Sequence, residues 1–205
     1  RASRLTSKSS TKGNATIDFT GADLANADLS GSTLTADSSY GGEATIVFIG
    51  ANLAHADLSG SKLTAEGLYS VEATIDFRDA NLARADMSGS IISVENSYGG
   101  ATIDFREANL AEADLSGSII RVENSYGGAT IDFREANLAN ANLSGSVLTA
   151  NSSLGSYGEA TVDFSEADLA NADLSGWRLT ADGAKGNATN NNNEANLDSA
   201  DLSGS

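Results

Sequence analysis

Large apolar residues recur at every fifth position through most of each repeat of this chain, and an alanine lies two positions before each leucine of the A-[DN]-L phrases. The stretch from Phe105 to Leu115 shows the pattern as F-REAN-L-AEAD-L, and Ile120 follows five residues later. A spacing of five does not keep side chains on one face of an α-helix, and Gly and Ser interrupt every copy. The pattern therefore predicts short β-strands joined by turns.

This pattern is nested in a longer repeat. All six phenylalanines end an A-T-[IV]-[DV]-F phrase, with spacings of 29, 29, 28, 28 and 31 residues: Phe19, Phe48, Phe77, Phe105, Phe133 and Phe164. A seventh copy is degenerate, because Asn190, Asn191 and Asn192 stand where Ile, Asp and Phe are expected. A partial copy, Ser3 to Thr6, precedes the first. A period of this size predicts a solenoid of stacked units.

Each repeat can be interpreted as one coil of that solenoid. Residues 15–19 alternate between inside and outside, as in a strand, and two five-residue steps then place Ala and Leu inside. S-x-[LI]-x-[AV] predicts a second strand, and a loop such as Ser97 to Gly100 closes the coil, with glycines that accept positive φ. Parallel stacking at about 4.8 Å per coil predicts roughly seven coils. We expect one domain, 1–205, with a partial first coil at 1–12 and a degenerate last coil at 188–205.

The five-residue steps, such as Ala22-Asp23-Leu24 and Ala108-Asn109-Leu110, resemble the A-[DN]-L-x-x motif of pentapeptide-repeat proteins. The resemblance covers nearly the whole chain and is specific in the middle of each repeat. It implies an all-β fold, a right-handed parallel β-helix with four sides, in which the central Leu or Phe and the preceding small residue face inward. The coil here is longer than the four fives of that family by eight to eleven residues. The Tyr-Gly loop is therefore expected to be an insertion or a fifth side.

Stacking turns repeat positions into columns of side chains. One column is acidic and is interrupted by Val47: Asp18, Asp76, Asp104, Asp132 and Asp163. Stacked like charges repel, so we expect a solvated column with raised pKa values and threonine donors, with bridging by calcium as the weaker alternative. A second column, Arg78, Arg106 and Arg134, lies beside Asp79, Glu107, Glu135 and Glu166 and predicts ion pairs between coils.

Aromatic residues form a further column, with one tyrosine in each internal loop: Tyr40, Tyr69, Tyr98, Tyr126 and Tyr157. We expect these rings to stack and fix the loops, with contact to a glycan or a cell surface as the alternative. Trp177 replaces a serine of the repeat and predicts a local change in packing, or, less simply, an interface contact. His55 is expected to be a solvated residue.

Composition narrows the possible functions. A formal charge of −16 disfavours binding to nucleic acid or anionic membranes. The sequence contains no run of eighteen apolar residues, so we expect no membrane insertion. With one His, no Cys, no phosphate-binding loop and no H-E-x-x-H motif, we expect neither an enzyme nor a cofactor. The chain opens on Arg1, which indicates processing or trimming. N-x-[ST] motifs at Asn14, Asn142, Asn151 and Asn187 favour an extracellular or cell-surface location.

The two ends of the sequence predict self-assembly. No proline and no amphipathic helix covers either end, and residues 3 and 205 fall at the same phase of the repeat. The start is basic and the finish acidic, which is complementary in a head-to-tail contact. The expected interface comprises Arg1, Arg4, Leu5, Lys8, Lys12, Ile17, Phe19, Asn190, Asn191, Asn192, Glu194, Leu197, Asp198, Asp201 and Leu202.

A contact of this kind does not close on itself, so it predicts a filament, sheath or surface layer. Two alternatives remain open. Some pentapeptide-repeat proteins are acidic rods that mimic duplex DNA and bind DNA gyrase, and the charge of this chain fits that function. The tyrosine column would instead suit an adhesin or a glycan-binding rod.

Overall fold

The computed structural model describes residues 2–153, 158–183 and 187–205, and in these residues every regular element is a β-strand. Fourteen strands form two parallel sheets of seven. A membrane-spanning helix is not found among the described residues. The first sheet contains β1 (Arg4–Ser9), β3 (Thr33–Ser38), β5 (Lys62–Gly67), β7 (Ile91–Asn96), β9 (Ile119–Asn124), β11 (Val147–Ser152) and β13 (Arg178–Gly183). The second contains β2 (Ala15–Asp18), β4 (Ala44–Val47), β6 (Glu72–Asp76), β8 (Gly100–Asp104), β10 (Ala129–Asp132), β12 (Ala160–Asp163) and β14 (Ala188–Asn191).

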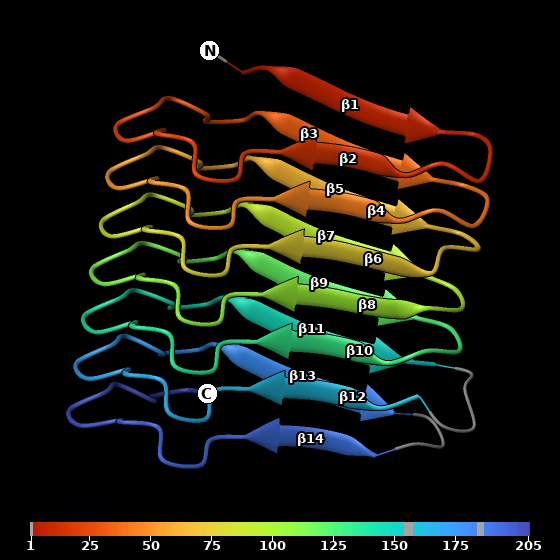
Figure 1. Cartoon of the computed structure of the whole chain (residues 1–205). Coiled ribbons are helices and arrows are strands. Elements are labelled where there is room, and N and C mark those ends of the chain that lie inside the picture. Colours follow the sequence, from red (N-terminus) through yellow and green to blue (C-terminus); the bar gives the residue numbers. More distant parts are fainter. Residues whose placement is uncertain (1, 154–157, 184–186) are drawn as a thin grey trace.

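The chain alternates between the two sheets, so that each coil contributes one strand to each sheet (Figure 1). The predicted parallel β-solenoid is therefore confirmed. The pairing keeps repeat positions in register: Thr16 lies opposite Thr45, and Ile103 lies opposite Ile131. Figure 1 shows the described Tyr-Gly loops at one end of the long coil and the five-residue steps at the other. The loop is thus an insertion that lengthens the coil at one end.

The five-residue steps form the two remaining short sides of each coil. Each side pairs with the next coil through an isolated parallel bridge at an Asp or Asn, as between Asn81 and Asn109. Each coil has two such bridges. Three positions after the first of them, the chain turns through a residue with left-handed backbone, as His55 (φ 59°) and Glu112 (φ 58°) show. Left-handed backbone in non-Gly residues is uncommon and favours Asn and Asp, so the turn must be held by its surroundings.

Alanine and large apolar side chains fill the interior. The phenylalanine rings form one continuous stack, with centroids 4.7–5.0 Å apart from Phe19 to Phe164. Phe105, Leu110 and Leu115 in the middle of the stack are fully buried. Because each coil is too thin to bury these side chains alone, the coils above and below supply the core.

Glycine in the Tyr-Gly loops has a different role from the one expected. Among the described glycines of these loops, only Gly41 has a positive φ, at 78°. Gly99 instead lies against the backbone of the preceding coil, where a Cβ atom would collide with the Val71 carbonyl oxygen. The loop sequence therefore reflects the close approach of neighbouring loops.

Candidate functional site

The acidic column on the second sheet is neutralised by arginine. Asp76, Asp104 and Asp132 are only 4–6% exposed. Each accepts hydrogen bonds from the arginine two residues later, with Arg106 Nη2 2.6 Å from Asp104 Oδ2. The same guanidinium reaches the next coil, where Arg106 Nε lies 3.5 Å from Asp132 Oδ2. This aspartate–arginine ladder links coils three to six, ending where Arg134 Nε lies 3.9 Å from Asp163 Oδ2.

Two sequence expectations for these columns are wrong. The acidic column is not a row of solvated carboxylates bonded to threonine, because arginine covers its central members. At Asp18, which has no arginine, hydrogen bonds from Thr20 lower the pKa where a raised value was expected. The arginines do pair across coils, but with this Asp column and not with Asp79, Glu107, Glu135 and Glu166. Alternation explains the choice, since residues two apart project from the same face.

The same carboxylates were the candidate ligands for calcium. Among the described residues, no group of three or more His, Asp or Glu side chains is arranged to hold a metal ion. Arginine supplies the countercharge to Asp76, Asp104, Asp132 and Asp163.

The structure contains a ladder of side-chain amides that was not predicted from the sequence. Asn52, Asn81, Asn109 and Asn137 donate from one coil to the side-chain oxygen of the coil before, at 3.1–3.3 Å. The side-chain oxygens of these asparagines accept the backbone N–H two residues later and so hold the turn. The [DN] position of the five-residue step was the available signal, because both residue types make this turn.

The tyrosines of the described loops form a stacked row. Centroid distances are 6.1 Å between Tyr40 and Tyr69, 5.5 Å between Tyr69 and Tyr98, and 5.0 Å between Tyr98 and Tyr126. Tyr157 lies outside the described residues. Each ring covers the faces of its neighbours while about half of each side chain stays exposed. A sugar would need an open ring face, which only the two ends of a stack can offer, so this geometry does not favour glycan binding along the row.

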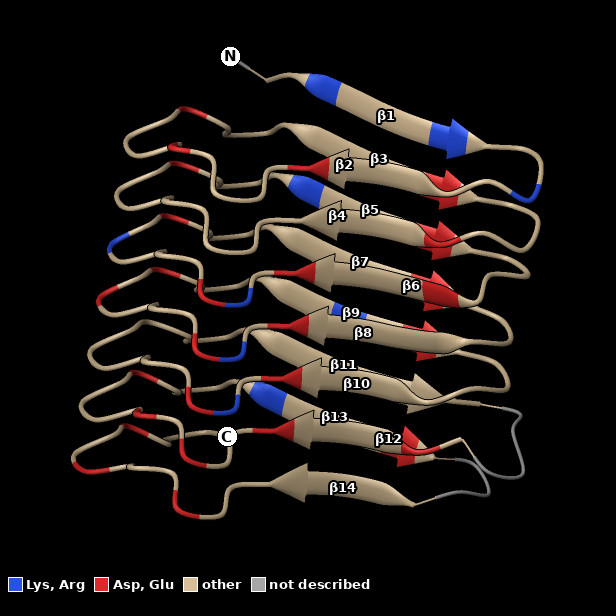
Figure 2. Ribbon diagram, viewed as in Figure 1, with Lys and Arg blue, Asp and Glu red and all other residues tan. Residues whose placement is uncertain are grey.

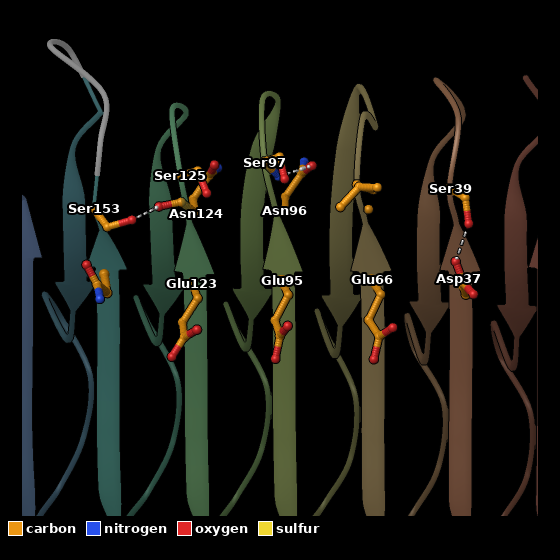
Figure 3. Close-up of a pocket in the computed structure, with 13 residues that line it drawn as sticks. Asp37, Ser39, Glu66, Glu95, Asn96, Ser97, Glu123, Asn124, Ser125 and Ser153 are labelled. Carbon is orange, nitrogen blue, oxygen red and sulfur yellow. Dashed lines mark hydrogen bonds between the residues drawn. The ribbon is translucent and has the colours of Figure 1, made fainter.

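A groove of about 420 Å³ runs along the first sheet beside these loops. Asp37, Glu66, Glu95 and Glu123 line it from successive strands of the first sheet, and Ser39, Ser97, Ser125 and Ser153 line it nearer the loops (Figure 3). Partial desolvation and the neighbouring carboxylates Glu95 and Asp37 raise the pKa of Glu66, although its side chain stays exposed. At the N-terminal end of the column, Lys8 Nζ lies 2.7 Å from Asp37 Oδ2, and this hydrogen bond raises the pKa of Lys8.

The end coils expose side chains that the central coils bury. Leu5 is 47% exposed, whereas Leu197 and Leu202 at the other end are 40% and 48% exposed. At the N-terminal end, an apolar pocket of about 100 Å³ is lined by Ser3, Leu5, Phe19, Leu29, Ser32, Leu34 and Phe48. Basic residues lie on β1, and acidic residues recur on the strands below it (Figure 2).

The remaining residues of the expected interface are distributed over both ends. Arg4, Lys12, Asn190, Asn192, Glu194, Asp198 and Asp201 are exposed or partly exposed, Phe19 and Asn191 are half-buried, and Ile17 is buried. Arg1 lies outside the described residues. Leu24 and Leu29, which were not among the predicted residues, are also only partly buried in the first coil.

Trp177 packs where the phenylalanine stack ends. Its ring meets Phe164 edge-on at a centroid distance of 5.7 Å, with an interplanar angle of 64°. The next phenylalanine position in the stack is Asn192, which cannot continue it. Trp177 therefore changes the local packing, as its sequence position predicts.

Comparison with known proteins identifies the repeat. The pentapeptide-repeat family model matches the chain with eight copies, at residues 17–36 and 131–151. Among solved structures, the chain is similar to HetL, a pentapeptide repeat protein involved in heterocyst differentiation regulation from the cyanobacterium Nostoc sp. strain PCC 7120. The identity is 22%, the coverage is 95% of this chain and 87% of HetL, and the TM-score is 0.21.

A second similar structure is QnrB1, a plasmid-mediated fluoroquinolone resistance protein. In its full-length form it is 16% identical and has a TM-score of 0.25, over 99% of this chain and 90% of QnrB1. A search of curated proteins found no match.

Proposed function

Because this chain belongs to the pentapeptide-repeat family, we propose that it is a structural β-solenoid subunit that stacks head to tail into an extracellular filament, sheath or surface layer. The observation that carries the proposal is the pair of exposed end surfaces. Each presents apolar side chains at repeat positions that are buried elsewhere in the rod, including Leu5, Leu197 and Leu202. Covering such side chains stabilises an assembly by about 25 cal/mol per Å² of apolar area.

Unpaired strand edges support the same contact. In the described chain, β1 pairs only with β3, and β13 pairs only with β11. The second sheet likewise ends at β2 and β14. Such edges present free N–H and C=O groups that template the addition of another strand. Strand β1 of one copy would continue the first sheet beside β13 of another.

The register of the existing coils specifies how the two copies would meet. Lys8 occupies the column that continues through Asp37, Glu66, Glu95, Glu123, Asn151 and Asp182. One further step in this register places Lys8 of the next copy beside Asp182. Lys8 already pairs with Asp37 within its own chain, so it would lie between two carboxylates.

The same register stacks apolar groups and one pair of like charges. Leu24 and Leu29 of the next copy would lie on Leu197 and Leu202. Arg4 would meet Arg178, and since both residues are exposed, solvent and salt weaken this repulsion. Asn190 to Asn192 would lie beside Ile17 to Phe19, where asparagine is tolerated in stacked strands.

Sedimentation velocity of the 205-residue chain over a range of concentrations tests the assembly. We expect a series of oligomers that grows with concentration, and elongated particles in electron micrographs. A single monomeric species at every concentration would contradict the proposal. The extracellular location is tested separately, by protease treatment of intact cells: the native protein should be digested without lysis.

Charge variants test the register. Lys8→Glu and Asp182→Lys each place like charges at the junction, and each should weaken association roughly fivefold. The double variant restores an opposite-charge pair and should recover assembly. Lys62→Glu, an exposed strand lysine in the middle of the rod, is the matched control and should assemble normally. Failure of the double variant to recover would reject this register.

A second candidate function is binding to DNA gyrase as an acidic mimic of duplex DNA. The groove column of Asp37, Glu66, Glu95 and Glu123 favours it, because successive coils carry carboxylates along one face of the rod. A supercoiling assay discriminates between the two functions. Inhibition of gyrase by Lys8→Glu at a concentration where sedimentation shows a monomer would favour the mimic, and unchanged supercoiling at micromolar protein would exclude it.

A further inference from the structure

The tyrosine row has a geometry suited to covalent chemistry. Tyr40, Tyr69, Tyr98 and Tyr126 come from four successive loops, and neighbouring rings are inclined by only 16–23°. Each side chain is about half exposed, with values from 49% to 57%. The rings are therefore in contact with one another and also accessible to a reagent in solvent.

We propose that this row is a site of oxidative cross-linking, at which a one-electron oxidant joins tyrosines of adjacent coils as dityrosine. A peroxidase that uses hydrogen peroxide is the chemical class of oxidant that fits. Each of two tyrosines loses one electron and its phenolic proton and becomes a phenoxyl radical. The radicals couple through ring carbons ortho to oxygen, and the two ring protons shift to the oxygens. Two tyrosines and one peroxide thus give one dityrosine and two waters.

The solenoid register favours coupling within one molecule. Each ring already has a stacked neighbour, and the shortest centroid distance, 5.0 Å, joins Tyr98 and Tyr126. Backbone hydrogen bonding between the same two loops, from Tyr126 N to Ser97 O at 3.0 Å, fixes their relative position. We therefore expect Tyr98–Tyr126 to be the main product.

The chain has no cysteine and so cannot form a disulfide, whereas a dityrosine would give it a covalent link between coils. It would tie consecutive coils together at the end of the coil opposite the five-residue steps (Figure 1). Covalent ties between distant residues reduce the freedom of the unfolded chain and so stabilise the folded one. This chemistry does not depend on head-to-tail assembly.

Two variants with equal tyrosine content test the proposal. In a Tyr157→Phe background, Tyr98→Phe removes two of the three stacked pairs, whereas Tyr40→Phe removes only one. Both substitutions keep an aromatic ring in the stack. After treatment with peroxidase and hydrogen peroxide, dityrosine fluorescence is measured in the monomer band of a denaturing gel. At early times we expect dityrosine to form at least about twofold faster in Tyr40→Phe than in Tyr98→Phe, because two stacked pairs remain, including the closest one, instead of one.

Peptide mapping of the background protein should find the Tyr98 peptide joined to the Tyr126 peptide. Oxidation in denaturant should abolish the difference between the two variants, because the register is then lost. Equal initial rates from the folded variants would overturn the proposal. So would dityrosine confined to covalent oligomers, or its absence from protein oxidised under conditions that couple free tyrosine.

Discussion

The fourth and seventh coils are built from the same sequence phrase but bury it very differently. Leu110 and Leu115 are fully buried in the fourth coil, while Leu197 and Leu202, at the same repeat positions in the seventh, are 40% and 48% exposed. The backbone bridges at Asn109 and Asn196 are of the same kind. The difference is that the fourth coil has a neighbour on both sides. Local structure in this solenoid thus follows the repeat, whereas burial depends on the next coil.

The largest expected effect comes from truncating leucine in the two coils. Leu110→Ala leaves a cavity in a closed core and should lower the free energy of unfolding by about 3 kcal/mol. Leu197→Ala removes a half-exposed side chain and should cost less than about 1 kcal/mol. Urea denaturation of both variants measures the difference. Equal losses would mean that burial does not depend on the neighbouring coil.

A smaller effect is expected from the arginines that close the acidic column. Arg106→Gln removes the guanidinium that donates to the Asp104 carboxylate, whose side chain is 6% exposed, and leaves only Arg78 Nε at 3.5 Å. The substitution should cost about 2 kcal/mol. The control is Arg84→Gln, because Glu112, its partner at 2.9 Å, is 51% exposed. Solvent and salt screen that pair, so its loss should leave the free energy of unfolding nearly unchanged. Denaturation at low and high salt checks both variants, and similar losses would contradict the ladder.

A stabilising substitution is expected at the serine column of the central coils. The Ser118 hydroxyl is buried and has no hydrogen-bond partner. Removing an unsatisfied buried polar group should stabilise the protein, so Ser118→Ala should raise the free energy of unfolding by about 1 kcal/mol. Ser205, in the last coil, donates to the Leu174 carbonyl oxygen at 3.0 Å, and its alanine variant should gain nothing. A melting temperature that falls for Ser118→Ala would refute this reasoning.

The smallest effect is a pH dependence in the groove. Because the pKa of Glu66 is raised in the folded protein, its ionisation opposes folding. The penalty is absent well below the unfolded pKa and complete once the pH exceeds the folded pKa. Glu66→Gln should therefore stabilise the protein at pH 7, by about 0.3 kcal/mol in this solvent-exposed setting, and change little near pH 3. A gain that grows toward acid would have the wrong sign.

The sequence predicted the solenoid because every inward position repeats. It also placed Trp177 at a change of packing. It could not choose partners for the arginines, since Asp76 and Asp79 are both close to Arg78 in sequence and only the coil geometry shows which faces it. The role of Gly99 was equally hidden, because its constraint comes from Val71 in another coil. The stacking of identical aromatic residues within a column was thus predictable, whereas the hydrogen-bond partners of polar side chains, which depend on coil shape, were not.

The central proposal is that the exposed end coils of neighbouring copies stack on one another. Cryo-electron microscopy of the 205-residue chain at high concentration tests it most directly. We predict filaments in which the subunits repeat every seven coils, roughly 33 Å along the axis, with β1 of one copy paired in parallel to β13 of the next. Isolated monomers at all concentrations, or an assembly joined through the sides of the rod, would contradict it.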